Sequence, residues 1–396
     1  MEQSREAVSP PGGETKKTIR TFAFASFFND MGSDMIYPIW PLFVASLGAN
    51  MAVLGFIDGL GNAIVSISQA ISGYISDRTR KRKIFIWLGY LCGGISRLGY
   101  ALSATWHWLV PFRILDRAGK MRGAPRDAMV ADLSIRSNRG ANFGIIRTMD
   151  NAGALVGIVF CIVFFPFLGY QNLLLIAAVP SFIAVALIVM NIREQRLEDA
   201  KLFKGISLGH LDGNFRLFVM LSAVFSLGAF SYSFLLIFAN KFGFQITTVP
   251  VFYLLFTLVA TFCSYPFGVL SDRIGRKAVL QISYILWWLV CLAMIFADSS
   301  WMVVAAFILF GLHQAGIDTV QKAFVTELGP VQYRASALGG FQMVIGLCAL
   351  PASVVAGLLW DRFGMQAPFI LSLGLTMVSA AMLFFVKERP LSLIHI

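Results

Sequence analysis

The sequence has few charged residues. Of its 396 residues, 13% are Asp, Glu, Lys or Arg, whereas soluble globular proteins have about 25%. Hydrophobic residues make up 57% of the chain, and its mean hydropathy is +0.73. So little polar surface cannot cover the apolar side chains in water, which excludes a soluble enzyme, a disordered chain and a nucleic-acid-binding module. The composition predicts a protein of the lipid bilayer.

Motifs for metals, nucleotides and covalent catalysis are also missing. The five cysteines lie in apolar stretches without C-x-x-C spacing, and no histidine is placed to complete a zinc site. There is no phosphate-binding loop and no nucleophile elbow. The first twenty residues lack the apolar region of a removable signal peptide. We therefore expect no cofactor, no metal and no enzymatic activity.

Twelve apolar stretches are long enough to cross the bilayer as helices, which takes about 20 residues. They lie at residues 20–47, 51–75, 83–104, 106–133, 138–165, 169–191, 214–243, 247–271, 277–297, 300–328, 332–359 and 365–386. Transmembrane strands are about half as long and alternate in polarity, so only helices suit these lengths. The sequence predicts an all-α membrane protein with twelve transmembrane helices.

The positions of Lys and Arg predict the orientation, because cytoplasmic loops retain positive charge. With a cytoplasmic N-terminus, 22 of the 32 basic residues fall in cytoplasmic segments, two in outer loops and eight inside spans. We expect both termini to be cytoplasmic. The net charge of +11 is then a topology signal, and we expect no nucleic-acid partner.

The two halves of the chain repeat each other at an offset of 195 residues. Residues 73–81 recur as 268–276, and residues 128–133 recur as 323–328. We expect two pseudo-symmetric six-helix bundles. The predicted boundaries are a tail at 1–19, a first bundle at 20–192, a linker at 193–213, a second bundle at 214–387 and a tail at 388–396.

A G-x-x-x-D-R motif stands between the second and third helices of each half, at residues 73–78 and 268–273. With twelve spans in two halves, this motif pair resembles the major facilitator superfamily (MFS) of secondary transporters. Residues 29–38 and 116–128 further resemble a widespread prokaryotic branch of the superfamily whose substrates are mostly unassigned. The resemblance implies a monomer of the prokaryotic inner membrane that moves a small molecule by alternating access.

By this resemblance, residues at the cytoplasmic ends of the second and fourth helices of each half close the cytoplasmic side in the outward-facing state. Asp77 has Lys81 four residues later, and the repeat places Asp272 and Arg276 likewise. The alternative is a solvated turn whose charges serve only topology. The candidate gating residues are Gly73, Asp77, Arg78, Lys81, Asp132, Gly268, Asp272, Arg273, Arg276 and Glu327.

Charges within the spans are concentrated in the first half. At the same offset Asp30 corresponds to Phe225 and Asp116 to Gly311, so the fold itself does not require these charges. A charge at bilayer depth costs roughly 2.5–3.5 kcal/mol and must be paired or face water. The candidate residues of the proton-coupling site and substrate cavity are Asp30, Asp34, Tyr37, Arg113, Asp116, Arg117, Lys120, Arg147, Asp150, Asn151, Gln314 and Asp318.

Two interpretations of these charges remain open. They are either buried pairs that only fix helix packing, or a site in which Asp34, or failing it Asp30, carries a coupling proton whose release Arg113 and Arg117 control. We expect a proton-coupled transporter of a small organic solute, with export favoured by the resemblance. The alternatives are a lipid translocator and a membrane sensor that does not transport.

Overall fold

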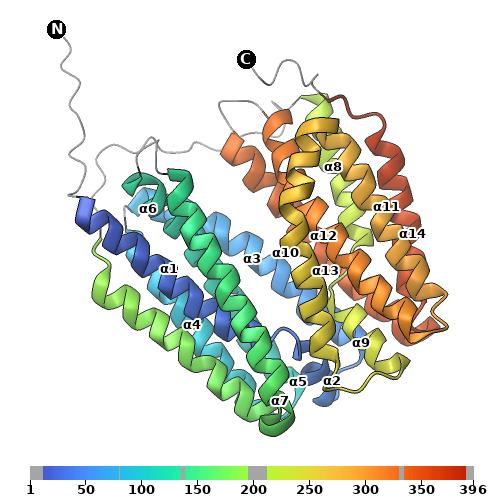
Figure 1. Cartoon of the computed structure of the whole chain (residues 1–396), viewed down its shortest axis with the longest axis horizontal. Coiled ribbons are helices and arrows are strands. Elements are labelled where there is room, and N and C mark those ends of the chain that lie inside the picture. Colours follow the sequence, from blue (N-terminus) through green and yellow to red (C-terminus); the bar gives the residue numbers. More distant parts are fainter. Residues whose placement is uncertain (1–11, 80, 135–138, 195–211, 330–333, 389–396) are drawn as a thin grey trace. The chain divides into compact units, whose positions relative to one another are not determined.

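The computed structural model describes residues 12–79, 81–134, 139–194, 212–329 and 334–388 (Figure 1). Within these ranges all regular elements are helices, which confirms the predicted all-α fold class. The helices are α1 (Gly12–Asp34), α2 (Trp40–Ser46), α3 (Met51–Thr79), α4 (Lys83–Leu102), α5 (Trp106–Ala118), the 3-10 helix η1 (Gly119–Arg122), α6 (Gly123–Leu133), α7 (Arg139–Asn191), α8 (Gly213–Gly228), α9 (Ser233–Phe242), α10 (Val249–Ile274), α11 (Arg276–Ile295), α12 (Ser300–Leu328), α13 (Arg334–Phe363) and α14 (Ala367–Leu383).

Eight helices of the described residues are long and apolar enough to cross a membrane. One of them, at Ala141–Asn191, covers the fifth and sixth predicted spans, which meet at Gly169 (φ 65°). The twelfth predicted span is the shorter apolar helix α14. The first and fourth predicted spans are not among these eight helices. Both contain charged residues, and in both the helix is interrupted.

The first span is interrupted at two prolines. Helix α1 ends at Asp34 and α2 begins at Trp40. Pro38 has no N–H to donate to the carbonyl of Asp34, and Pro41 has none for the carbonyl of Tyr37, so the helical ladder cannot continue. Interrupted helices at bilayer depth are typical of binding sites in transporters.

The fourth span is interrupted by η1, which lies between α5 and α6. Here two glycines let the backbone of η1 approach α4 closely. A Cβ atom on Gly119 would lie 2.6 Å from the carbonyl oxygen of Gly89, and one on Gly89 would collide with the carbonyl oxygen of Gly119. Glycine at both positions therefore fixes where η1 packs, and with it the polar side chains of this span.

The helices form two compact units, and each is described by itself. The first unit comprises residues 1–37, 68–103 and 111–203, and the second comprises residues 38–67, 104–110 and 204–396. The core of the first unit joins α1, α4, α6 and α7 around buried residues such as Phe22, Tyr90 and Ile146. In the second unit, rings such as Phe218, Trp287 and Phe307 are buried among α8, α11 and α12.

Residues 38–67 and 104–110 thus belong to the first half of the sequence but pack with the second half. The predicted bundle boundaries at 20–192 and 214–387 stay predictions. Helix α1 begins at Gly12, within the predicted N-terminal tail. The remainder of that tail at 1–11, residues 195–211 of the predicted linker and the C-terminal residues 389–396 lie outside the described residues.

Candidate functional site

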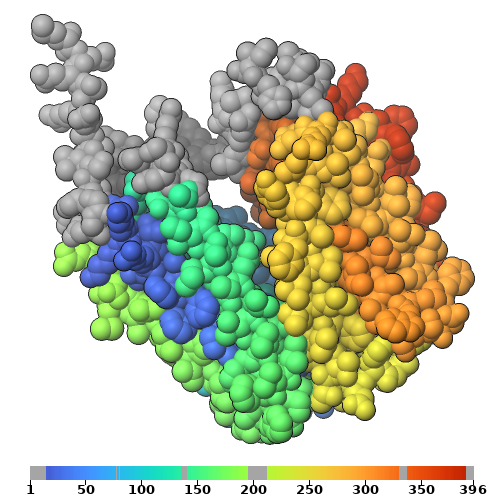
Figure 2. Space-filling model, in the orientation of Figure 1, coloured from blue at the N-terminus to red at the C-terminus, as the bar shows by residue number. Residues whose placement is uncertain are grey.

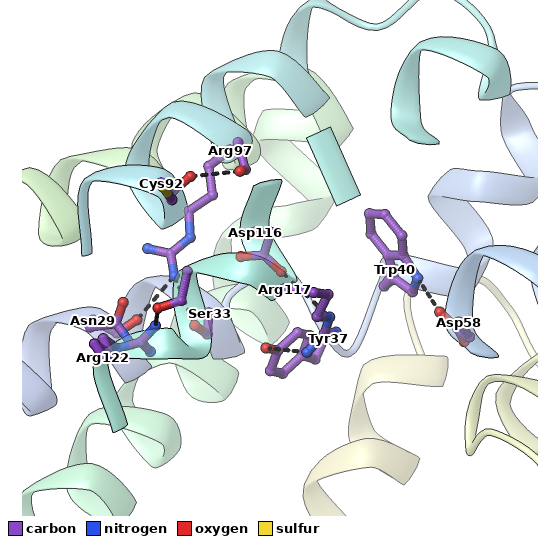
Figure 3. Close-up of polar contacts among 12 residues, drawn as sticks. Asn29, Ser33, Tyr37, Trp40, Asp58, Cys92, Arg97, Asp116, Arg117 and Arg122 are labelled. Carbon is purple, nitrogen blue, oxygen red and sulfur yellow. Dashed lines mark hydrogen bonds and ion pairs between the residues drawn. The ribbon is translucent and has the colours of Figure 1, made fainter. Parts of the chain in front are cut away.

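Within the first unit, α5 and the end of α1 meet through Tyr37 and Arg117. The Arg117 guanidinium donates a hydrogen bond to the Tyr37 hydroxyl at 3.3 Å and lies 5.2 Å from the centre of the ring (Figure 3). Asp116 lies 3.6 Å from the Nε of Arg117. Arg113 is 4% exposed, and its charge and that of Lys120 also act on Asp116. Tyr37, just after α1, and Arg117 of α5 thus bring the first and fourth spans into contact.

A second group of charges joins α1, α6 and α7 in the same unit. Arg126 lies 3.7 Å from Asp150, donates to Asp127 at 2.9 Å and donates to the Ser26 hydroxyl at 2.7 Å. Asp30, half-buried, accepts a hydrogen bond from Asn29 at 2.8 Å, and its charge acts on Asp150. The carboxyl groups of Asp127 and Asp150 therefore contact the guanidinium of Arg126, and the charge of Asp30 acts on one of them, Asp150. We call Ser26, Asp30, Arg126, Asp127 and Asp150 the α1–α7 charge cluster.

Arg126 is a residue that sequence reasoning missed as a site residue. The sequence predicts a stripe of Arg147, Asp150 and Asn151 on one helix face, but Arg147 and Asn151 are exposed while Asp150 is 7% exposed. Arg126 is the cation in ion-pair contact with Asp150. At the repeat offset Arg126 corresponds to Gln321, so this cation is also confined to the first half.

Arg97 has a different role from the other buried cations. Its side chain is 2% exposed and donates to the carbonyl of Asn29 at 3.2 Å and to the hydroxyl of Ser33 at 2.8 Å (Figure 3). It also donates to the carbonyl of Ala177 at 3.1 Å and to the hydroxyl of Ser181. These partners are neutral and belong to α1 and α7. Arg97 lies on α4 and thereby joins α1 to α7. At this position the contacts favour the interpretation that a buried charge fixes helix packing.

The other candidate residues are more dispersed. Asp34 is half-buried as the last residue of α1, and its charge acts on Tyr37. Gln314 and Asp318 lie on α12 in the second unit, where Gln314 is half-buried and Asp318 is exposed.

The candidate gating residues form matching clusters in the two halves. In the first half Arg82 pairs with Asp132. In the second half Arg276 pairs with Glu327 at 2.9 Å and with Asp272 at 2.7 Å. A Cβ atom on Gly73 would lie 3.5 Å from the side chain of Ala124, and one on Gly268 would lie 3.5 Å from that of Thr319, the repeat equivalent of Ala124. The repeat therefore extends to side-chain packing.

A glutamate completes each of these clusters. Glu194 accepts from the backbone N–H groups of Arg82 and Lys83 at the start of α4, at 2.7 and 2.9 Å. Glu388 likewise accepts from the N–H of Arg276 at the start of α11. A carboxylate at a helix N-terminus satisfies free N–H groups and interacts favourably with the helix dipole. Sequence reasoning missed both glutamates as gating residues.

By its contacts Arg82 matches Arg276, whereas the sequence offset of 195 aligns Arg276 with Lys81. Both arginines begin a helix, receive the same glutamate cap and pair with the equivalent acids Asp132 and Glu327. The loop of the first half is one residue longer, so the offset is 194 at this arginine, whereas it is 195 between Asp132 and Glu327. Lys81 is exposed, as are Arg78 and Arg273. The side chain of Asp77 lies outside the described residues.

Within the second unit, Asp58 of α3 contacts residues from both halves of the sequence. Its side chain is 3% exposed and accepts hydrogen bonds from the Trp40 indole at 2.8 Å, Ser231 at 2.7 Å and Ser233 at 2.5 Å. Figure 3 shows the Trp40 bond. The two serines lie at the start of α9. A buried carboxylate with three donors thus joins the first predicted half to the second.

Asp361, near the end of α13, makes a second contact of this kind. Its two carboxylate oxygens accept from the backbone N–H groups of Met51 at 3.1 Å and Ala52 at 2.9 Å. These are the first two residues of α3. The carboxylate thereby caps the N-terminus of a helix that is more than 300 residues distant in the sequence.

Between these two contacts the backbones of α3 and α13 approach closely. A Cβ atom on Gly55 would lie 2.7 Å from the carbonyl carbon of Ser353, and one on Gly59 would lie 2.7 Å from the Cα of Leu350. Small residues are what permits such an approach between membrane helices. We call the Asp58 and Asp361 bonds, together with this packing, the outer contact, because the Lys and Arg distribution predicts that this end faces outside.

Comparison with known proteins agrees with this architecture. Residues 22–263 and 216–394 match the family model described as Major Facilitator Superfamily. The chain is 36% identical over 394 residues to an uncharacterised MFS-type transporter of Methanocaldococcus jannaschii, which covers 97% of this chain and 98% of that protein. It is 26% identical over 185 residues to the multi-drug resistance efflux pump PmrA of Streptococcus pneumoniae, covering 45% of this chain and 46% of the pump.

Among solved structures, the nucleoside transporter NupG shares the fold, with a TM-score of 0.77 and 17% identity over 94% of this chain and all of that one. The match to the family model extends over nearly the whole sequence and includes both halves of the repeat. This chain is therefore a multi-pass membrane protein that belongs to the major facilitator superfamily of transporters.

Proposed function

We propose that this protein is a proton-coupled secondary transporter that exports a small organic solute by alternating access. It would act as a monomer in a prokaryotic cytoplasmic membrane, with both termini inside. The observation that carries the proposal is the α1–α7 charge cluster, a set of charges around the buried Asp150 whose three acids have no acidic counterpart at the repeat offset in the second half.

The charge balance of this cluster favours a titrating carboxyl group. Asp127 and Asp150 pair with the half-buried guanidinium of Arg126, and the charge of Asp30 also acts on Asp150. The side chains of Asp127 and Arg147 are more exposed and therefore more solvated. In the less exposed part of the cluster, Asp30 and Asp150 carry two negative charges against the one positive charge of Arg126, and this surplus is relieved when one acid takes up a proton. We propose Asp30 and Asp150 as the coupling pair and Asp34 as a further candidate.

The substrate site that we propose is formed by Tyr37, Arg113, Asp116, Arg117 and Lys120. Tyr37 lies in the interruption of the first span and Lys120 lies in η1, while the other three residues lie in the part of α5 that precedes η1. Interruptions of this kind leave backbone groups that are not bonded within a helix. Their charges are of both signs, which suits a polar or zwitterionic solute better than a simple anion. Gln314 and Asp318 of α12 are further candidates for substrate contact, in the second unit.

The outer contact supports alternating access. It consists of hydrogen bonds and close packing between segments of the two halves, with no covalent link, so it can break and reform as a unit. We propose that the Asp58 and Asp361 bonds close the outer side, and that the Asp132 and Asp272 clusters belong to the opposite gate. Export as the direction rests on the likeness to the efflux pump PmrA.

A thermal-shift screen followed by counterflow tests this function. A solute that binds the native protein raises its melting temperature, so a panel of metabolites and antibiotics identifies a candidate. Liposomes preloaded with that solute should then show transient uptake of the labelled solute when they contain the protein. Binding without counterflow for every solute found would contradict transport and favour the sensor.

A further inference from the structure

A surface cavity lies in the first unit between the start of α1 and the end of α7. Its volume is about 470 Å³, and it is lined by Lys16, Lys17, Arg20, Thr21, Phe24, Leu187 and Asn191. Figure 2 shows the blue surface of α1 beside the yellow-green surface at the end of α7. Neither transport nor gating, as proposed above, uses these residues.

Three of the lining side chains are cations, and all three are exposed. Among the residues that the structure describes, no carboxylate lines the cavity. Glu194, three residues beyond Asn191, accepts from the first N–H groups of α4 instead of contributing to this lining. The described lining of the cavity is thus positively charged, which suits a phosphate group.

The polarity of the lining changes along both helices in the same direction. On α1, Phe24 lies one turn from Arg20, which lies one turn from Lys16 or Lys17. On α7, Asn191 lies one turn from Leu187, which lies one turn from Ile183, whose side chain is 39% exposed. Phe24 is 51% exposed. An apolar surface therefore continues directly from the cationic end towards the middle of both spans.

The second half provides an internal comparison. At the repeat offset Lys17 corresponds to Asp212 and Arg20 to Phe215, which is 2% exposed. There the start of α8 is joined to the chain after α14 by two hydrogen bonds between Asn214 and the backbone of Lys387, at 2.8 and 2.9 Å. The fold therefore does not require an open cationic cavity at this place.

We propose that this cavity binds an anionic phospholipid of the cytoplasmic leaflet, with Lys16, Lys17 and Arg20 at the phosphate and Phe24 and Leu187 against the acyl chains. A free anion would use the cations but not the adjoining apolar surface. Charge complementarity and the polarity gradient together select a lipid, because its headgroup and chains are arranged in the same order from the interface inwards.

The test is binding of phosphatidylglycerol to the purified full-length protein in detergent, measured by native mass spectrometry against phosphatidylcholine. The variant Lys16→Gln/Lys17→Gln/Arg20→Gln should lose roughly fivefold in phosphatidylglycerol affinity per cation removed. The control Arg216→Gln/Arg362→Gln/Lys387→Gln loses the same charge at exposed positions elsewhere, and it should retain the wild-type preference. Phe24→Ser should weaken the binding of both lipids.

Several outcomes would overturn the proposal. One is equal phosphatidylglycerol binding by the cavity variant and the wild type. Another is competition by inorganic phosphate at the same concentration as the lipid, which would make the cavity a site for soluble anions. A third is a preference for phosphatidylglycerol that emerges only when residues 1–11 are deleted, which would assign the cavity to the chain's own N-terminal segment. None of these results depends on transport.

Discussion

Replacing Asp361 with Asn should open the outer contact. The Asp361 carboxylate accepts from the N–H groups of both Met51 and Ala52, whereas an amide has one acceptor oxygen and no charge to interact with the helix dipole. We expect the loss of this carboxylate cap to cost about 1 kcal/mol, in the middle of the range usual for helix N-caps. A larger cost is not expected, because Asp361 is exposed and solvent screens its charge. The ratio of outer-open to outer-closed protein should therefore rise about fivefold.

Cysteine labelling can measure this change. Ser353 is 1% exposed and lies against Gly55 in the outer contact. With the five native cysteines replaced by serine, Ser353→Cys should react with a membrane-impermeant maleimide only when the contact opens. While the open form is a minority, its labelling rate is proportional to that population. Asp361→Asn should raise the rate about fivefold.

Glu194→Gln is the matched control for this measurement. Glu194 caps the start of α4 through two backbone N–H groups, as Asp361 caps α3, but both of its partners belong to the first unit. Its replacement should cost a similar amount of folding stability, but it should not raise the labelling rate, because Glu194 belongs to the opposite gate. An unchanged rate in Asp361→Asn, or an equal increase in Glu194→Gln, would refute the role of Asp361 in the outer contact.

Three further results are expected. Asp58→Asn should raise the same labelling rate roughly thirtyfold, because an amide cannot accept from all three donors and an unpaired buried donor costs about 2 kcal/mol; a rate equal to wild type would contradict this. Arg97→Gln should lower the free energy of unfolding by about 3 kcal/mol without altering the labelling rate, since the partners of Arg97 are structural; faster labelling at unchanged stability would place Arg97 in gating instead. A reporter active only in the cytoplasm should give signal when fused after Arg389 and none at Lys241, and the reverse would overturn the orientation.

The sequence predicts the transmembrane segments well, because hydropathy over twenty residues dominates the cost of crossing a bilayer. The tenth predicted span and α12 share the same bounds, 300–328. Hydropathy does not reveal the interruptions of the first and fourth spans. Pro38 and Pro41 nonetheless indicate the interruption of the first span, since neither has an N–H to donate within a helix. A residue-by-residue alignment of the loops would likewise have paired Arg82 with Arg276.

The charge cluster shows where helical spacing is insufficient. An uninterrupted fourth helix places Arg126 on the face opposite the substrate-site residues, away from the cavity. The four residues of η1 turn by about 120° each instead of 100°, so the phase of α6 shifts by about 80° relative to α5. Arg126 then faces Ser26 and Asp150. Nothing in the sequence near Asp361 indicates that it caps α3, because the N–H groups that it accepts from lie 310 and 309 residues earlier.

The most direct test of the proposed coupling is accumulation of the transported solute in proteoliposomes under an imposed pH gradient. The wild type should accumulate it. Asp30→Asn and Asp150→Asn should keep counterflow but lose the accumulation, because exchange requires only that the loaded carrier reorients. Arg216→Gln, a change at an exposed position on α8 outside the cluster, should behave as the wild type. Full accumulation by Asp30→Asn, Asp34→Asn, Asp150→Asn and their combinations would contradict proton coupling through these carboxyl groups and leave the cluster a purely structural role.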